Sequence, residues 1–360
     1  MKVLNISLDK KVLDKNSVVA KRMIEYGNLV GQYTILVLAD ENNKVELSPK
    51  VKVIAVKKSG RISSLFKLKK KAEEILLADK YDIITAQDAY FIGKLAVKLA
   101  KRFKLGLEVQ VHGFEKLNFI RKITAKYVLK EADAVRVVSQ RLRAELISKY
   151  NVDENKITVV PIFTDLRFKI KDLRKKENEK FIFLTVGRLV PVKNIEMQIK
   201  AMAEVARKYS QAELWIVGKG SELRSLKSEV RRLKIENNIE FLGWQDNLEK
   251  FYEQADCFLL TSDSEGWGMA VVEAAQFSLP IIMTDVGLAG EVIKDGESGI
   301  LIPVGDEQAL ERAMIILIED ENLRKKLGEG AREAVQKLPG KDETLELYKK
   351  SWGIAVFESI

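Results

Sequence analysis

The fold class is decided by the stretch Phe181-Ile182-Phe183-Leu184-Thr185-Val186-Gly187-Arg188-Leu189-Val190-Pro191-Val192-Lys193-Asn194. Its first part, residues 181–186, is a nearly unbroken apolar run with the length of a buried strand. Gly187 then allows the chain to turn sharply, and a pattern of helical period follows over 194–208. Strand, glycine turn and helix in this order form the repeating unit of a doubly wound α/β sheet.

The same unit recurs on both sides of this stretch. In the N-terminal half, the patterns predict strands at 2–8, 33–39, 51–56, 82–85, 107–111, 134–138 and 157–160, with helices at 17–29, 64–79, 91–103, 121–131 and 140–149. In the C-terminal half, they predict strands at 181–186, 213–217, 239–242, 257–261 and 280–284, with helices at 194–208, 221–234, 247–254 and 269–277.

Between the two series lies a polar stretch, residues 169–180, that has no apolar periodicity and is predicted to be a linker. A chain of 360 residues also exceeds what one core usually supports. We therefore expect two Rossmann-like α/β domains that face each other across a cleft, at 1–165 and 166–344. Ligands of such sheets bind at the carboxyl ends of the strands, so the loops there are the candidate sites.

Composition indicates a water-soluble globular protein, with 46% hydrophobic and 31% charged residues. Cys257 is the single cysteine, which excludes an internal disulfide and fits a reducing compartment. The N-terminal apolar segment is too short for a signal sequence, and no run approaches the about 20 residues that span a bilayer. We expect a cytoplasmic protein or one bound peripherally to the inner face of the membrane.

Charge is distributed unevenly. Residues 1–165 contain 32 Lys/Arg against 19 Asp/Glu, whereas residues 166–360 contain 29 against 33. Such asymmetry favours an anionic partner for the first half, although a solvated lysine-rich surface explains any single cluster equally well. The segment 60–71 mixes a basic cluster with Leu65, Phe66 and Leu68. These three side chains could enter the interface of an anionic membrane, a reading that Arg121, Lys122 and Lys126 favour slightly. Alternatively, Leu65 and Leu68 could pack on the sheet while the lysines stay in water. A nucleic-acid partner is not expected, because no recognition motif accompanies the basic residues.

The first candidate site motif follows the strand at 181–186. Arg188 and Lys193 flank the start of the next helix, and Asn194 is a favourable N-cap residue. Two cations beside the positive end of a helix form a site for a diphosphate. The alternative is a turn that carries two solvated cations.

The second motif, Gly218-Lys219-Gly220, is another glycine turn between strand and helix. It lacks the spacing of a phosphate-binding or dinucleotide-binding fingerprint, so it indicates only that a polar group approaches the backbone.

The third motif, Ser264-Glu265-Gly266-Trp267-Gly268-Met269-Ala270-Val271-Val272-Glu273, is more specific. Gly266 and Gly268 free backbone amides to face a ligand at the start of a helix. Glu273 lies in an apolar helix, where a buried carboxylate needs hydrogen-bond donors. Two vicinal ribose hydroxyls would supply them, and an internal salt bridge or a capping role is the alternative.

These motifs together resemble glycosyltransferase family 4, a group of retaining enzymes with the two-domain GT-B fold. The ordered match also includes Phe241-Leu242-Gly243-Trp244, Pro280, Thr284-Asp285-Val286-Gly287 and Asp295-Gly296-Glu297-Ser298-Gly299. The resemblance implies transfer of a hexosyl unit from a nucleotide diphospho-sugar to a glycan or a lipid-linked acceptor. It also implies that the last helix, 345–360 with Tyr348 and Trp352, returns to the N-terminal domain.

The resemblance assigns roles by position. Arg188 and Lys193 would neutralise the donor diphosphate. Other residues of the donor site would be Gly187, Asn194, Gly218, Lys219 and Gly220. Trp244 and Gln245 would contact the base and Glu273 the ribose, and Glu265 would hold a sugar hydroxyl. The amides of Gly266, Trp267, Gly268, Met269 and Ala270 would contact sugar and phosphate. No Asp-x-Asp metal motif occurs, since Asp263-Ser264-Glu265 is only similar to one, so we expect no metal or other cofactor.

The N-terminal half matches less tightly. The resemblance places His112, the only histidine, beside the donor sugar, although a structural histidine at a strand end is the alternative. Gln87, Asp88 and Ser139 occupy similar strand ends and are expected on the acceptor side. The family's glycine pair after the first strand is absent, and Lys10 or Lys11 would replace its amide contacts by charge. A second departure is Ser278, where the family usually has glycine.

Two other functions remain open from the sequence alone. One is a nucleotide-sugar epimerase or hydrolase on the same fold. The other is a non-catalytic partner protein that keeps the GT-B fold. Intact Arg188, Lys193, Glu265 and Glu273 argue against the second.

Overall fold

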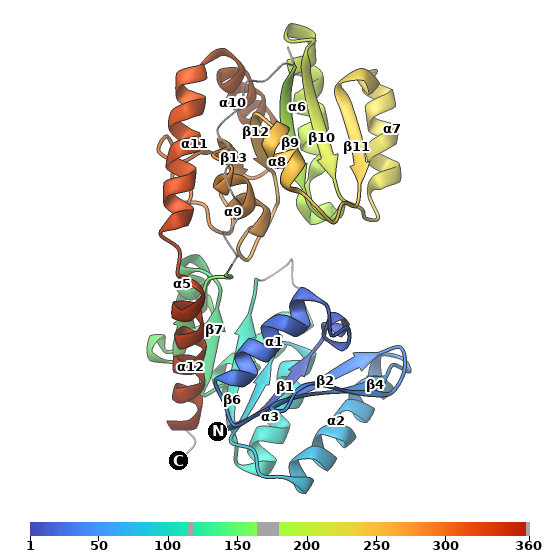
Figure 1. Cartoon of the computed structure of the whole chain (residues 1–360), viewed down its shortest axis with the longest axis vertical. Coiled ribbons are helices and arrows are strands. Elements are labelled where there is room, and N and C mark those ends of the chain that lie inside the picture. Colours follow the sequence, from blue (N-terminus) through green and yellow to red (C-terminus); the bar gives the residue numbers. More distant parts are fainter. Residues whose placement is uncertain (114–118, 164–179, 358–360) are drawn as a thin grey trace. The chain divides into compact units, whose positions relative to one another are not determined.

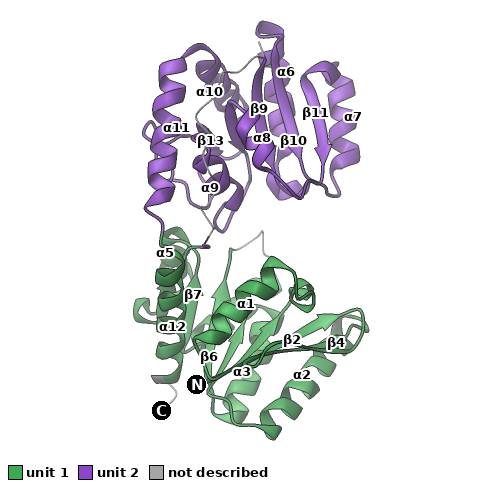
Figure 2. Ribbon diagram, viewed as in Figure 1, with its two compact units in different colours: residues 1–161, 339–360 green, residues 162–338 purple. Residues whose placement is uncertain are grey.

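The computed structural model describes residues 1–113, 119–163 and 180–357. It divides into two compact units, unit 1 with residues 1–161 and 339–360, and unit 2 with residues 162–338 (Figure 2). The predicted boundaries at 165 and 344 lie a few residues later. Each unit contains a largely parallel sheet with helices packed against it, as the alternating pattern predicts. The predicted linker at 169–180 lies almost wholly outside the described residues.

Unit 1 is built on an eight-stranded sheet of order β3-β4-β2-β1-β5-β6-β7-β8 (Figure 1). Its strands are β1 Lys2–Ser7, β2 Gln32–Ala39, β3 Asn43–Ser48, β4 Val51–Lys57, β5 Ile83–Ala86, β6 Gly106–Val111, β7 Ala134–Val137 and β8 Ile157–Val159. All neighbours pair in parallel except β3 with β4. Strands buried on both faces need apolar residues throughout, which is why these runs are visible in the sequence.

Strand β3 was not predicted. It forms an antiparallel pair with β4 at the edge of the sheet, and its residues are exposed or half-buried. An edge strand with a solvated face carries polar side chains, so its sequence, Asn43-Lys44-Val45-Glu46-Leu47-Ser48, resembles a loop.

Helices cover both faces of this sheet. They are α1 Val18–Asn28, α2 Arg61–Ala78, α3 Phe91–Phe103, α4 Phe119–Glu131, α5 Gln140–Tyr150 and the C-terminal α12 Lys341–Phe357, with a short 3-10 helix at Lys10–Leu13. Helices α2, α3 and α4 contact one another in sequence order, whereas α12 contacts α1 and the strands β6, β7 and β8 (Figure 1). Right-handed crossovers place α1 on the opposite face from α2, α3 and α4.

Unit 2 is built on a six-stranded parallel sheet of order β11-β10-β9-β12-β13-β14. The strands are β9 Phe181–Val186, β10 Ala212–Val217, β11 Ile239–Gly243, β12 Cys257–Leu260, β13 Ile281–Thr284 and β14 Ile300–Ile302. The helices are α6 Ile195–Lys208, α7 Leu223–Leu233, α8 Glu249–Gln254, α9 Met269–Gln276, α10 Glu307–Glu319 and α11 Glu321–Gln336, with a 3-10 turn at Pro191–Lys193. Helices α10 and α11 and strand β14 extend the pattern beyond the elements predicted from the sequence.

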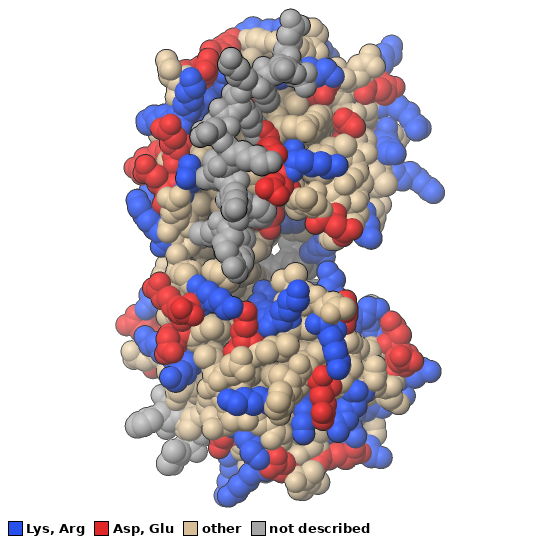
Figure 3. Space-filling view, viewed as in Figure 1, with Lys and Arg blue, Asp and Glu red and all other residues tan. Residues whose placement is uncertain are grey.

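On the visible face of the molecule, positive and negative side chains are interspersed, and neither sign dominates (Figure 3). Among helices in the described ranges, none combines the length and the apolar character that a membrane span requires.

Candidate functional site

The predicted donor residues of unit 2 lie where the strand order reverses. From β9 the chain passes outward to β10 and β11, and it then returns to β12 on the other side of β9 before continuing to β13 and β14. The loops after β9 and β12 therefore leave neighbouring strands at the same edge of the sheet. In open α/β sheets this reversal leaves a crevice at the carboxyl ends of the strands, where ligands bind.

Hydrogen bonds hold these two loops against each other. The Asp263 amide donates to the Val192 carbonyl at 2.8 Å, and the Thr261 hydroxyl donates to the Asn194 carbonyl at 3.0 Å. The Asn194 side chain donates to Asp263 Oδ1 at 3.3 Å. The backbone of Asn194 is left-handed, with φ of 46°, and its side chain makes no capping bond to α6. Asn194 thus occupies the predicted N-cap position of α6, but its side chain ties the two loops together and does not cap the helix.

Lys193 and Glu265 meet between these loops. The Lys193 ammonium forms an ion pair with Glu265 Oε1, and the Ser262 hydroxyl donates to the same oxygen at 2.7 Å. The side chains of Lys193 and Glu265 are 21% and 12% exposed, so the pair is only partly shielded from solvent. Among the described residues, Glu265 Oε2 has no hydrogen-bond partner, and an ammonium group has three donors. The pair can thus hold a ligand hydroxyl on one side and an anion on the other.

Arg188 occupies a different position in the same loop. It is exposed, and within the ranges that the structure describes its side chain makes no ion pair or hydrogen bond. A guanidinium at the carboxyl end of a strand, without a protein carboxylate, is available for bidentate binding of a phosphate group.

Glu273 lies in the second turn of α9, which begins at Met269 directly after Gly268. Its Oε2 accepts a hydrogen bond from the buried Tyr252 hydroxyl at 2.8 Å, while no described residue donates to its Oε1. Burial raises the pKa of the Glu273 carboxyl above its ordinary value, although the bond from Tyr252 acts in the opposite direction. The alternative role for Glu273, an internal salt bridge, is not seen among the described residues. One carboxylate oxygen is held in place and the other is left for a ligand.

The segment between these two glutamates is fixed by backbone packing. Gly268 has a φ of 116°, and the Leu288 amide donates to the Trp267 carbonyl at 3.0 Å. The Trp267 side chain is buried, and its indole N–H has no partner among the described residues. Trp267 can therefore contribute its backbone to a ligand site but not an exposed ring. Gly266, Met269 and Ala270 are half-buried at the start of α9.

Gly218 and Gly220 are explained by close approach of the neighbouring loop. A Cβ atom at Gly218 would lie 1.8 Å from the Gly187 carbonyl oxygen, and one at Gly220 would lie 2.0 Å from the Leu189 carbonyl oxygen. The Leu189 amide donates to the Lys219 carbonyl at 3.0 Å. The polar group that approaches this glycine turn is thus the backbone of the loop that carries Arg188. The glycines bring the loops after β9 and β10 into contact.

A Gly218→Ala variant is expected to lose unfolding free energy through this contact. Gly296→Ala is the matched control, because Gly296 also has a positive φ, of 69°, but a Cβ atom there would have no neighbouring atom within 4 Å. The overpacked site should lose about 1–3 kcal/mol more than the control, measured by urea unfolding. Equal losses in the two variants would show that backbone strain alone, and not the contact with the Gly187 carbonyl, explains the need for glycine at position 218.

Lys219 and Trp244 come together beside these glycines. The Lys219 ammonium lies 5.2 Å from the centre of the Trp244 ring, which is 54% exposed, and the Trp244 indole donates to Asp246 at 3.0 Å. The Gln245 side chain donates to the Leu242 carbonyl at 2.8 Å, so it supports the loop after β11. An exposed ring with a cation at this edge offers a stacking surface for a planar base.

In unit 1, His112 directly follows strand β6 with its side chain exposed, and Gly113 comes next with a φ of 148°. The residues that continue the predicted motif, Phe114 and Glu115, lie outside the described residues. Gln87 accepts from the Ser7 hydroxyl at 2.7 Å and so links the ends of β1 and β5. These side chains occupy the strand ends where the sequence placed them, and their roles remain predictions.

The other acceptor-side residues of unit 1 have structural partners. Asp88 accepts hydrogen bonds from the Tyr90 and Gly93 amides at 2.7 and 3.4 Å, and burial raises its pKa despite these bonds. Ser139 is buried and accepts from the Leu142 amide at 3.2 Å, which caps α5. The Lys10 ammonium pairs with Asp40 at 2.8 Å, and Lys11 is exposed in the turn after β1. Their roles toward an acceptor remain predictions.

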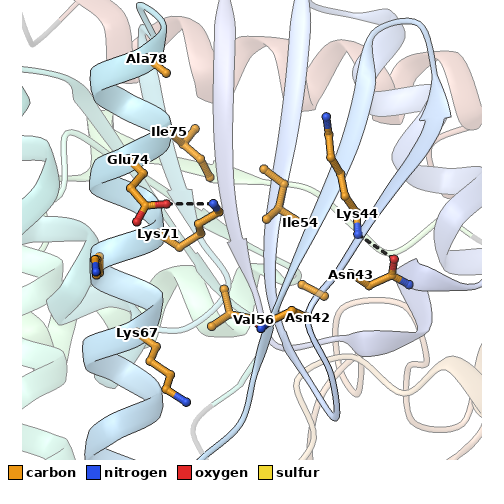
Figure 4. Close-up of a pocket in the computed structure, with 12 residues that line it drawn as sticks. Asn42, Asn43, Lys44, Ile54, Val56, Lys67, Lys71, Glu74, Ile75 and Ala78 are labelled. Carbon is orange, nitrogen blue, oxygen red and sulfur yellow. Dashed lines mark hydrogen bonds and ion pairs between the residues drawn. The ribbon is translucent and has the colours of Figure 1, made fainter.

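A pocket of about 810 Å³ opens elsewhere in unit 1, between α2 and the edge strands β3 and β4 (Figure 4). Lysines at its rim include Lys44, Lys67 and Lys71, and Lys71 is paired with Glu74 at 2.9 Å. None of the site residues predicted from the sequence lines this pocket.

Sequence reasoning missed Tyr252 and Ser262, which hold Glu273 and Glu265. Tyr252 lies in α8, 21 positions before Glu273, and no local pattern marks it as a partner. Ser262 lies in the loop just before the third motif. Its hydroxyl, three positions before Glu265, was the one local sign that it could bind that carboxylate.

Comparison with protein-family models gives two matches that together cover most of the chain. Residues 167–334 match the family described as glycosyl transferases group 1, and residues 30–168 match glycosyltransferase family 4.

Two curated proteins are similar in sequence. The N-acetyl-alpha-D-glucosaminyl L-malate synthase of Bacillus anthracis is 34% identical over 220 residues, which are 58% of this chain and 56% of the relative. An uncharacterized glycosyltransferase of Methanocaldococcus jannaschii is 30% identical over 270 residues, 64% of this chain and 65% of the relative. The chain thus matches less than two thirds of the length of either relative.

Two solved structures share the fold. Sucrose-phosphate synthase from Thermosynechococcus elongatus superposes with a TM-score of 0.84 at 21% identity, covering 98% of this chain and 99% of that one. HepE of Anabaena, solved in complex with UDP and glucose, gives a TM-score of 0.78 at 19% identity, again over 98% and 99% of the two chains. With its two parallel-sheet domains and its family matches, the chain belongs to glycosyltransferase family 4 and has the GT-B fold.

Proposed function

We propose that this glycosyltransferase moves a hexosyl unit from a UDP- or GDP-sugar to a hydroxyl of a glycan or a lipid-linked glycan, with retention of anomeric configuration. The bond between the anomeric carbon and the diphosphate oxygen breaks, and a bond from that carbon to the acceptor oxygen forms. The nucleoside diphosphate leaves with the bonding electron pair, and the acceptor hydroxyl loses its proton.

The observation that carries the proposal is that two cations and a glutamate lie in neighbouring loops of unit 2, where the strand order reverses. Arg188 and Lys193 lie in the loop after β9, and Glu265 lies in the loop after β12 that is hydrogen-bonded to it. As the leaving diphosphate gains charge, fixed cations stabilise it more than they stabilise the bound donor. The UDP bound by the structural neighbour HepE supports the same class of donor.

The two glutamates suit hydroxyl recognition. In each carboxylate one oxygen is held by the protein, Glu265 by Lys193 and Ser262 and Glu273 by Tyr252, and the described residues leave the other oxygen open. We assign Glu273 to the ribose hydroxyls and Glu265 to a hydroxyl of the transferred sugar. The family resemblance implies that His112 would contact the donor sugar.

Retention fits a front-face route in which the leaving phosphate helps to deprotonate the acceptor hydroxyl. Glu265 is already neutralised by Lys193, which makes it a poor nucleophile for a covalent intermediate. Arg188, Lys193 and the amides of α9 would stabilise the leaving group without a metal. Activity that survives exhaustive treatment with EDTA would support that part of the proposal, and restoration by added Mg²⁺ or Mn²⁺ after loss would overturn it.

Glu273→Gln is expected to raise the dissociation constant of the nucleoside diphosphate by about 10- to 100-fold, because charged acceptors bind hydroxyls more strongly than neutral ones. In the wild type, affinity should also fall with decreasing pH as Glu273 becomes protonated. Since burial raises the pKa of Glu273, this fall should begin above the pH range of an ordinary glutamate. Calorimetric titrations at several pH values measure both effects.

The control is Glu253→Gln, which removes a carboxylate from the neighbouring helix α8 without touching the site. It should keep wild-type affinity and the same pH dependence. If the affinity of Glu273→Gln still falls with decreasing pH as in the wild type, a group other than Glu273 causes that fall. The assignment of Glu273 to the ribose hydroxyls then fails.

The overall function is tested by thermal-shift screening with UDP, GDP, ADP and their sugars, followed by incubation of the stabilising donor with and without acceptors. A transferase releases nucleoside diphosphate faster when an acceptor is present. An epimerase converts the donor without an acceptor, a hydrolase releases free sugar, and a non-catalytic partner protein does neither. Absence of stabilisation by every sugar nucleotide would overturn the proposal.

The cellular setting belongs to the same proposal. A lipid-linked acceptor would place the enzyme on the inner face of the membrane, with the basic N-terminal unit toward anionic lipid. A cytoplasmic enzyme with a free glycan acceptor would have no need of such a surface.

A further inference from the structure

Helices α3 and α4 of unit 1 present a strongly cationic surface. They pack side by side, and both contact strand β6. Their sequences contain eight Lys or Arg residues and one carboxylate, Glu131, which is paired with Lys101 at 2.5 Å. All eight cations are exposed, namely Lys94, Lys98, Lys101, Arg102, Arg121, Lys122, Lys126 and Lys130.

Large apolar side chains are exposed among these cations. On α4, Phe119, Ile120 and Ile123 are 78%, 66% and 55% exposed, and Tyr127 follows one turn later. The opposite side of α4 buries Ala125, Val128 and Leu129 against unit 1. The helix thus has two apolar sides, and packing within unit 1 accounts for only one of them. Phe91, at the start of α3, adds a fifth exposed apolar side chain.

Helix α2, where the sequence suggested membrane contact, also exposes large apolar side chains, Ile62, Phe66 and Leu77, but it differs in its charge. Leu68 is fully buried and Leu65 is half-buried, so the alternative in which Leu68 packs within unit 1 is confirmed. Phe66 is exposed as predicted. However, both carboxylates of α2 pair with its own lysines, Glu74 with Lys71 and Glu73 with Lys69, and Glu73 also pairs with Arg102 of α3.

We propose that the outer surface of α3 and α4, the α3–α4 face, binds the surface of an anionic lipid bilayer. The cations match the negative surface potential of such a membrane. Phe119, Ile120 and Ile123 match its acyl boundary, into which the apolar side of an interfacial helix inserts. A nucleic acid would satisfy the cations and leave these apolar side chains in water. The proposal concerns where the enzyme works and does not depend on the identity of its donor.

The test uses the full chain and vesicles of phosphatidylcholine alone or mixed with phosphatidylglycerol. Wild type should sediment with the mixed vesicles, more weakly at high salt, and not with phosphatidylcholine alone. Two variants address the two parts of the face, Lys122→Glu with Lys126→Glu for charge, and Ile120→Ser with Ile123→Ser for insertion. Each should reduce vesicle binding by at least about tenfold.

The matched control is Lys67→Glu with Lys70→Glu, which makes the same charge change at exposed positions of α2. It should bind vesicles nearly as well as wild type, and all variants should share the wild-type circular dichroism spectrum and donor-induced thermal shift. Equal loss in the control would show that net charge and not the α3–α4 face determines binding. Binding of the serine variant at wild-type strength, or failure of wild type to bind anionic vesicles, would also overturn the proposal.

Discussion

Arg188→Ala is expected to lower kcat for glycosyl transfer by about 10²–10³-fold, the usual effect of removing one fixed group that stabilises transition-state charge. Arg188 is exposed at the carboxyl end of β9, and its side chain makes no hydrogen bond or ion pair within the described residues. Its removal therefore breaks no contact that holds the fold. The comparison of kcat with KM for the donor measures the effect, because a group that acts mainly on the leaving diphosphate changes kcat more than KM.

Two further variants make the result specific. Arg188→Lys keeps the charge but loses the planar fork that binds phosphate through two hydrogen bonds, so it should recover only part of the rate. Arg231→Ala removes an exposed arginine from the last turn of α7 and should leave both constants unchanged. If Arg188→Ala turns over like wild type, Arg188 is a solvated cation in a turn and its assignment to the diphosphate is wrong.

Lys193 would give a less direct answer than Arg188. Removing its ammonium would leave Glu265 without its ion-pair partner in a partly buried position, and the freed carboxylate would repel a diphosphate. A loss of activity in Lys193→Ala would then combine a lost cation with a gained anion. This coupling was invisible in the sequence, where the two residues stand 72 positions apart and have separate roles.

The local patterns that could be predicted from the sequence share one physical cause. A strand buried on both faces must be apolar along its whole length, so runs such as Phe181–Val186 and Cys257–Leu260 are visible without any partner. Because the loops that follow parallel strands lie at one edge, the placement of Arg188, Lys193 and Glu265 near the strand ends also followed.

The parts that could not be predicted depend on partners distant in sequence. At Gly218 the sequence indicated only that a polar group approaches the backbone, and in the folded chain that group is the Gly187 carbonyl, which a side chain would overlap. Asn194 is the N-cap residue of α6, as predicted, but its side-chain amide donates to Asp263 and makes no capping bond. Tyr252 is fixed to Glu273 by tertiary packing alone. In each case a local preference was overridden by a contact that only the folded chain creates.

Glu108→Ala is expected to have the largest effect on stability, because the buried Glu108 carboxylate joins β6 to the C-terminal helix α12 through hydrogen bonds. Glu108 is fully buried and lies 3.2 Å from the guanidinium of Arg136 on β7. Ser351 and Trp352 of α12 donate to it at 2.6 and 3.2 Å, and Thr85 of β5 donates at 2.5 Å. Four donors thus converge on one carboxylate, and two of them come from the last helix.

Loss of this carboxylate leaves Arg136 as an uncompensated charge. Arg136 is only 5% exposed and lies 3.7 Å from the centre of the Tyr348 ring. Leaving a buried cation without its partner costs about 3–5 kcal/mol. The loss should appear in the unfolding of unit 1, which contains one tryptophan, Trp352, as a fluorescent probe. Glu41→Ala, which removes an exposed carboxylate of the same unit, should change the unfolding free energy by less than about 0.5 kcal/mol.

The double variant Glu108→Ala with Arg136→Ala separates the charge from the packing. If the uncompensated guanidinium dominates the cost, the double variant loses much less stability than the sum of the two single variants. It should still be less stable than wild type, because Thr85, Ser351 and Trp352 keep donors without an acceptor in the core. Additive losses would show that Glu108 and Arg136 contribute independently, and that the ion pair does not anchor the last helix to unit 1.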